Sequence, residues 1–158
     1  LNFLNLSSTF FIIILFMKQE NIVIIKNIMN LEVLKIASNN NNSKVVKDFT
    51  HYSKHRNSLC GDQIEITLKI KDNVIIDIGY QSKACIYCEA SASLISRKFI
   101  KKRKNNLKQL INLLKNWPAK TDIIFPKKWK DFKKLFNNKN LTRKDCLLLP
   151  FKAIDKKI

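Results

Sequence analysis

Glycine is scarce in this sequence, with only 2 in 158 residues, so the position of each one is informative. Gly61 stands between Cys60 and Asp62 in the segment SLCGDQIEI. Glycine lets the backbone turn sharply or approach another group closely. A turn at Gly61 can direct the side chains of Cys60 and Asp62 toward one object, and thiolates and carboxylates both bind metals. The segment therefore predicts part of a metal site.

Arginine is also scarce, although the chain is strongly basic, with a formal net charge of +18. Most of its 30 basic residues are lysines scattered along the chain, which indicates a solvated surface rather than a nucleic-acid site. A structural zinc domain on a nucleic-acid binder is disfavoured further, because no pair of C-x-x-C motifs is present. We expect no nucleic-acid partner, while the basic surface could help an acidic protein to dock. The arginines are Arg56, Arg97, Arg103 and Arg143.

Cysteines are few, but their number is compatible with either two disulfides or one metal site. Two disulfides are typical of small secreted chains, whereas 158 residues can bury the core of one ordinary domain. No basic region or small-residue cleavage site marks a signal peptide. We therefore expect a cytoplasmic protein whose cysteines bind a metal. The cysteines are Cys60, Cys85, Cys88 and Cys146.

The N-terminal residues 1–16 form an uncharged apolar run, LNFLNLSSTFFIIILF. The run is too short for a comfortable membrane span. The chain begins with Leu, and Met17 and Met29 follow as possible starts. We therefore expect residues 1–28 to be an upstream extension and residues 29–158 to form the domain. The alternative is a membrane anchor, and without one no membrane contact is expected.

The remaining pattern predicts an α+β fold in which a small antiparallel sheet of about three strands packs against several helices. Apolar and polar residues alternate over 64–70, a turn follows at 71–73, and 74–80 returns as the second strand of a hairpin. Residues 49–56 are a candidate third strand. Residues 29–42 are expected to form a short amphipathic helix that ends in an Asn-rich loop. Further helices are expected over 85–100, 105–117, 126–136 and 142–158, the last capped by Thr142 and kinked or restarted at Pro150.

This topology predicts that the metal-binding residues meet at one end of the sheet. An antiparallel hairpin returns the chain to its starting end, so Cys60 and Asp62 should lie beside Cys85. Cys146, near the start of the last helix, could supply a fourth ligand. Three thiolates and one carboxylate are a suitable set for Zn²⁺ or iron.

Other reactive side chains have simpler interpretations. Cys88 lies one helical turn after Cys85 and is expected to be a small buried residue. A redox pair is the alternative, but the thioredoxin-like motif requires a βαβ unit. His51 and His55 are expected to be ordinary strand or surface residues. The serines of the ASAS segment, at 91 and 93, are expected to be packing residues because no base is paired with them.

Three motifs together resemble the NifU N-terminal or IscU-like family of iron–sulfur cluster scaffolds. They are CGDQIEITLKI, KACIYCEASASLIS and RKDCLLLPFKAI. The resemblance implies that Cys60, Asp62, Cys85 and Cys146 are the cluster ligands. It also implies a scaffold rather than an enzyme: a cysteine desulfurase supplies sulfur, a transient [2Fe–2S] cluster is built, and recipient apo-proteins accept it.

Two departures from the IscU type favour an alternative function in sulfur transfer. Asp145 precedes Cys146 where IscU-type members have His, and the segment between Cys85 and Cys146 is long, as in the SufU branch. Resemblance to SufU implies a zinc-dependent sulfurtransferase that relays persulfide from a desulfurase. In that reading Cys146 is the expected persulfide carrier.

Overall fold

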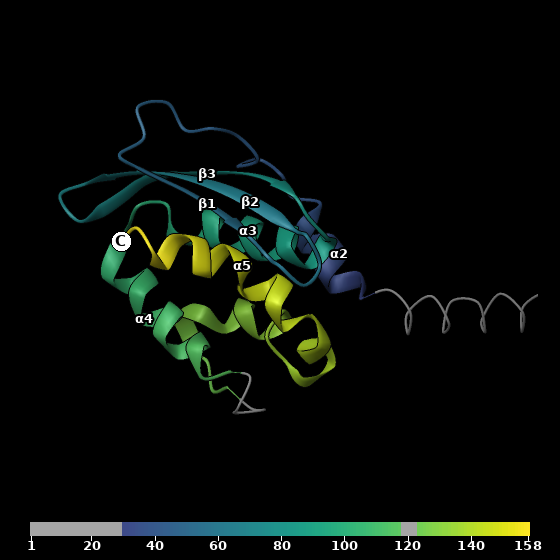
Figure 1. Cartoon of the computed structure of the whole chain (residues 1–158). Coiled ribbons are helices and arrows are strands. Elements are labelled where there is room, and N and C mark those ends of the chain that lie inside the picture. The colour runs from purple at the N-terminus through teal and green to yellow at the C-terminus, as the bar shows by residue number, and fades with distance from the viewer. Residues whose placement is uncertain (1–29, 118–122) are drawn as a thin grey trace, which may run out of the picture. The chain divides into compact units, whose positions relative to one another are not determined.

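The computed structural model describes residues 30–117 and 123–158, and the expected extension over 1–28 lies outside these ranges. The sheet contains β1 (His51–Arg56), β2 (Gln63–Lys71), β3 (Val74–Lys83) and β4 (Lys102–Arg103). All neighbouring strands are antiparallel, in the order β1-β2-β3-β4. Figure 1 shows β1, β2 and β3 side by side. The hairpin and the third strand are confirmed. The sequence missed β4 because two residues are too short to show a pattern.

The β2–β3 hairpin follows from its alternating pattern and its turn residues. Ile64, Ile66 and Leu68 of β2 are buried, and their neighbours face away from the helices. At the turn, Asp72 and Asn73 have φ angles of +50° and +63°. Two consecutive residues with positive φ suit a two-residue hairpin turn, and Asp and Asn tolerate this conformation.

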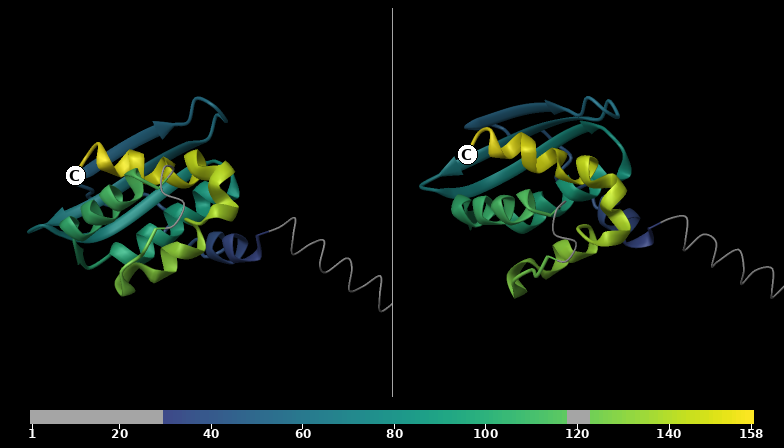
Figure 2. Two further views of the ribbon diagram at one scale, coloured as in Figure 1. Left: turned by 90° about the horizontal axis from the view of Figure 1, so that it is seen from below. Right: turned by 60° about the horizontal axis from the view of Figure 1, so that its bottom comes forward.

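The helices cover one face of the sheet. Helices α3 (Ile86–Phe99) and α5 (Lys144–Asp155) pack on each other, α3 against β3 and α5 against β1 and β2 (Figures 1 and 2). Helix α4 (Lys104–Lys115) buries the apolar face expected of it. The other helices are α2 (Leu31–Ala37) and the 3-10 helices η1 (Lys127–Lys134) and η2 (Asn138–Arg143). The α+β architecture is therefore confirmed, and no helix in the described ranges is long and apolar enough to cross a membrane.

Three helical details differ from the expectations. Residues 127–134 form a 3-10 helix rather than an α-helix, a geometry in which Trp129 and Phe132, three residues apart, share one buried face. The last α-helix begins at Lys144 rather than at Thr142, because η2 occupies the preceding residues. Helix α5 also continues through Pro150 without restarting.

The second glycine is required by a close backbone approach. The segment 38–50 crosses the face of the sheet that the helices leave uncovered, and its Asn42 carbonyl accepts a hydrogen bond from the Tyr80 backbone at 3.1 Å. A Cβ at Gly79 would lie 2.2 Å from the carbonyl oxygen of Lys44. Real Cβ atoms do not approach that closely, so only glycine fits at this position.

Candidate metal centre

Three of the expected ligands meet at one end of the sheet. One ligand atom from each of Cys60, Asp62 and Cys146 lies within 4.8 Å of the other two. Gly61 has a φ of +78°, which is the turn expected from its position. The loop closes through hydrogen bonds from Gly61 N to Asn57 O (2.9 Å) and from Asn57 N to Asp62 O (2.8 Å). The turn therefore brings Cys60 and Asp62 to the same place.

Cys85 adjoins this group from a second element, although its thiol is not among the three ligand atoms that lie within 4.8 Å of one another. It is the N-cap residue of α3, at the point where β3 has ended. Its thiol and its backbone N–H interact with the Asp62 carboxylate, and its thiol also interacts with Cys146. A loop, a helix N-terminus and the first turn of α5 thus each contribute to one cluster, and all four expected residues adjoin.

The four residues differ in their access to solvent. Cys60 is exposed and Cys85 is partly exposed. Cys146 and Asp62 are only 7% and 9% exposed. The cluster is therefore open on the side of the Cys60 loop and closed on the side of α5.

The Asp62 carboxylate is suited to a cation. Burial acts to raise its pKa, but hydrogen bonds from the Cys85 thiol and backbone N–H, with those from Cys60 and Cys146, outweigh burial and hold the pKa below its ordinary value. Its Oδ2 atom is nevertheless buried with no hydrogen-bond partner among the described residues. An unpartnered buried carboxylate oxygen beside three thiols matches the chemistry of a metal site, since a cation would satisfy it.

Deprotonation of the Cys146 thiol is unfavourable when no metal is bound. Burial raises the pKa of this thiol, and its contacts with Cys85 and Cys60 raise it further. A bound cation reverses this balance, because metal binding favours the deprotonated ligand. Cys146 is therefore expected to become a thiolate when a metal binds rather than before.

The other candidate residues stay outside this cluster. Cys88 is fully buried in the hydrophobic core, and burial raises the pKa of its thiol, as expected of a small core residue. His51 and His55 lie on β1, where their ring nitrogens contact Thr50 and Lys156. Neither histidine belongs to the group of potential ligands found in the described part of the chain.

The two serines of the ASAS segment do more than pack. Ser91 Oγ donates to the Leu147 carbonyl at 2.7 Å, and Ser93 Oγ donates to the Asn39 carbonyl at 2.6 Å. Both serines are buried. The sequence showed small residues on a helix but not their partners, which lie more than 50 residues away in the chain.

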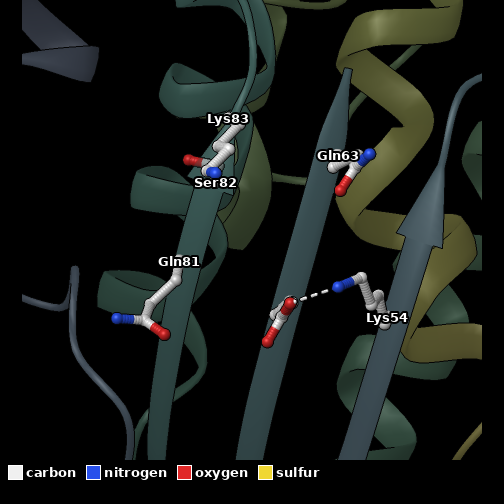
Figure 3. A pocket seen from close by; sticks show the side chains of 6 residues that line it. Lys54, Gln63, Gln81, Ser82 and Lys83 are labelled. Atoms are coloured by element: carbon white, nitrogen blue, oxygen red, sulfur yellow. Dashed lines mark hydrogen bonds and ion pairs between the residues drawn. The ribbon is translucent and has the colours of Figure 1, made fainter. Parts of the chain in front are cut away.

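A polar groove of about 330 Å³ lies on the sheet face opposite the helices (Figure 3). In it Lys54 Nζ lies 2.7 Å from Glu65 Oε1. No cysteine lines this groove, so it is separate from the metal centre. Its lining residues are Lys54, Gln63, Glu65, Gln81, Ser82 and Lys83.

Comparison with protein families identifies the group to which the chain belongs. The model of the NifU-like N-terminal domain matches residues 29–116, more than half of the chain. The chain therefore belongs to the NifU-like N-terminal domain family, as the three cysteine motifs predicted.

Two curated proteins are similar in sequence to this chain. The iron–sulfur cluster assembly scaffold protein IscU of Thermotoga maritima is 28% identical over 89 residues, which are 56% of this chain and 63% of the relative. The alignment therefore spans less than two thirds of that protein. A protein of unassigned function from Borreliella burgdorferi is 29% identical over 125 residues, which are 78% of this chain and 84% of the relative.

Solved structures show the same fold. The N-terminal part of a nitrogen-fixing NifU-like protein from Brucella abortus superposes with a TM-score of 0.75 at 22% identity, covering 84% of this chain and 92% of that one. A protein from Fervidobacterium islandicum, described as a cluster assembly scaffold for the SUF system, gives a TM-score of 0.68 at 15% identity, with 80% and 93% covered. These likenesses establish the α+β fold independently of the motifs.

Proposed function

We propose that this protein is an iron–sulfur cluster assembly scaffold that builds a [2Fe–2S] cluster on Cys60, Asp62, Cys85 and Cys146. The observation that carries the proposal is the convergence of three of these ligand atoms within 4.8 Å, with Cys85 in contact with two of the three residues. Membership of the NifU-like N-terminal domain family supports it. In this role the cluster is cargo, and the protein has no turnover of its own.

The ligand types suit cargo that has to be released. Thiolates are soft ligands that hold iron–sulfur clusters firmly, whereas the Asp62 carboxylate is a hard ligand. A mixed set should hold the cluster less firmly than four thiolates. We therefore expect Asp62→Ala to slow the loss of an assembled cluster, measured as the decay of its visible absorbance after a chelator is added. Faster loss in this variant would contradict this role of Asp62.

Sulfur is proposed to arrive from a cysteine desulfurase as a persulfide. A thiolate of the scaffold attacks the outer sulfur, a new S–S bond forms, and the desulfurase thiolate leaves, so this transfer has no net redox change. Reduction of each sulfane sulfur to sulfide then takes two electrons from an added thiol reductant. The exposure of Cys60 suits it to meet the partner first, whereas Cys146, the carrier expected from the sequence, can reach the partner only from a buried position.

The alternative function is a zinc-dependent sulfurtransferase that relays the persulfide onward. Three thiolates and one carboxylate are also a suitable tetrahedral set for Zn²⁺. The long segment between Cys85 and Cys146 favours this reading, since η1 and η2 add helical structure before the third ligand. Recipient apo-proteins accept a cluster under the first function and sulfur under the second.

One reconstitution experiment separates the two functions. The protein is purified without oxygen and incubated with iron, cysteine, a thiol reductant and a cysteine desulfurase, and its iron, zinc, acid-labile sulfide and visible spectrum are measured. Iron and sulfide appearing together with charge-transfer absorbance supports the scaffold. One retained zinc, no cluster and faster desulfurase turnover supports the sulfurtransferase. Binding of neither metal would contradict both.

A further inference from the structure

The turn of α5 that carries Cys146 lacks part of the usual helical bonding. In an α-helix the carbonyl of residue 146 accepts a hydrogen bond from the backbone N–H of residue 150. Residue 150 is proline, which has no N–H and whose ring crowds that carbonyl. The first turn of α5 is therefore less firmly held by its own helix than an ordinary first turn.

Contacts with α3 hold this turn on both sides of Cys146. One residue after Cys146, the Leu147 carbonyl accepts a hydrogen bond of 2.7 Å from the fully buried Ser91 hydroxyl. Three residues before it, the Arg143 guanidinium lies 5.7 Å from the centre of the Tyr87 ring. Ser91 and Tyr87 both belong to α3, the helix whose N-cap is Cys85.

We propose that Ser91 is a positioning residue for the metal centre, because its hydrogen bond to the Leu147 carbonyl sets the place of Cys146 relative to Cys85. Cys85 and Cys146 belong to separate helices, so the distance between them depends on how α5 is fixed to α3. A buried hydrogen bond beside the ligand fixes that relation directly. The proposal rests on the proposed role of Cys146 as a ligand.

Ser93 provides a matched control on the same helix. It is also buried, and its hydroxyl donates to the carbonyls of Asn39 and Ile36 at 2.6 and 3.0 Å. These carbonyls lie on the segment around α2 and not on α5. Ser91→Ala and Ser93→Ala therefore each remove one buried hydroxyl two residues apart, but only the first frees the Cys146 turn.

The first test measures thiol reactivity in the metal-free full chain. Each variant receives a short pulse of N-ethylmaleimide, and modification of every cysteine is quantified by mass spectrometry. Cys88 is fully buried, so its reaction reports global opening. We expect Ser91→Ala to raise the ratio of Cys146 to Cys88 modification about tenfold, and Ser93→Ala to leave it unchanged.

The second test measures Co²⁺ affinity by competition with a chelator, with the thiolate charge-transfer bands as the signal. We expect about tenfold weaker binding in Ser91→Ala and less than about a twofold change in Ser93→Ala. An unchanged modification ratio in Ser91→Ala, or the same rise in both variants, would overturn the positioning role even if Co²⁺ binds. A raised ratio in Ser91→Ala alone, with no Co²⁺ binding by any protein, would support the positioning of Cys146 and contradict the proposed function.

Discussion

Cys60 and Cys146 reach the same carboxylate in opposite ways. Cys60 is exposed on a loop that turns at Gly61, where φ is +78°. Cys146 is 7% exposed in the first turn of a helix packed against α3 and the sheet. Asp62 lies between them, with ligand atoms of all three within 4.8 Å.

This difference assigns separate tasks to the two sides of the centre. A loop thiol can meet a partner protein with little rearrangement, because loops adjust more easily than packed helices. A helix thiol held by buried contacts can define the geometry of the site. Under the proposed scaffold function, the accessible side would suit exchange of cargo and the fixed side would suit holding it.

The largest expected effect is the loss of a ligand from either side. Cys60→Ser and Cys146→Ser should each weaken Co²⁺ or Zn²⁺ binding by at least about 100-fold, because a soft charged ligand becomes a neutral hydroxyl. Cys88→Ser is the control, since Cys88 is buried in the core and lies outside the ligand group. Competition titration with a chelator measures all three. An equal loss of metal affinity in Cys88→Ser and Cys146→Ser would show that the ligands are assigned to the wrong residues.

Replacing each glycine by alanine compares the loss of stability in the Cys60 loop with that in the packed sheet. Gly79→Ala should destabilise the fold by more than about 2 kcal/mol, because its Cβ would overlap the Lys44 carbonyl and push the segment 38–50 away. Gly61→Ala meets no close neighbour, with Arg56 Nη2 at 4.0 Å, so only the backbone strain of positive φ remains, about 1–2 kcal/mol. Chemical denaturation measures both. A larger loss of stability for Gly61→Ala than for Gly79→Ala would contradict the expectation that the close backbone approach at Gly79 is the stronger constraint.

Pro150→Ala should strengthen the fixed side of the centre. Alanine restores the N–H that can bond to the Cys146 carbonyl and has a far higher helix propensity than proline. Part of this gain is offset because the unfolded chain becomes more flexible. We expect a net increase of about 1 kcal/mol in unfolding free energy and slower modification of Cys146, measured by denaturation and by thiol labelling.

The control for this change is Pro126→Ala. Pro126 is the N-cap residue of η1, so its replacement adds no interior helical hydrogen bond. It should give no gain in stability. A gain of the same size at both prolines would mean that the effect of Pro150→Ala does not come from the Cys146 turn.

The smallest expected effect is the pH dependence that comes from Asp62. Burial acts to raise its pKa, but the hydrogen bonds from Cys85, Cys60 and Cys146 outweigh it, so the folded-state pKa lies below the unfolded value of about 3.8. A lowered folded pKa contributes stability that is fully present above that unfolded value and is lost as the pH falls through the folded pKa. The metal-free protein should therefore be more stable than Asp62→Asn at pH 7, and this difference should vanish in strong acid. If Asp62→Asn were more stable than the unchanged protein at pH 7, the expected direction of the pKa shift of Asp62 would be wrong.

The sheet and the meeting of the ligands could be anticipated from local patterns. The alternation in β2 and the turn at Asp72 and Asn73 define the hairpin, and an antiparallel hairpin returns Cys85 to the Cys60 loop. The position of Cys146 near the start of the last helix made it a possible fourth ligand, but only the family resemblance assigned it to the set, because no local pattern states where α5 packs. The sequence thus predicted the meeting of these residues better than the details of the helices around them.

The errors arose where tertiary contacts outweigh local preference. Residues 127–134 resemble an amphipathic α-helix, but a 3-10 helix is formed with Trp129 and Phe132 in the core. Pro150 is tolerated inside α5, where Ser91 bonds to the neighbouring Leu147 carbonyl. Such partners are distant in the chain, so periodicity could not show them.

We expect Cys60, Asp62, Cys85 and Cys146 to bind metal together as one ligand set, whether the cargo is a cluster or the ion is zinc. X-ray absorption spectroscopy of the Zn²⁺-loaded protein, compared with Asp62→Ala, tests it most directly. We expect three sulfur ligands and one oxygen ligand, with the protein oxygen replaced in the variant while the three sulfurs remain. Four sulfur ligands would place Cys88 in the centre and contradict this ligand set, as would two sulfur ligands with no change on removal of Asp62.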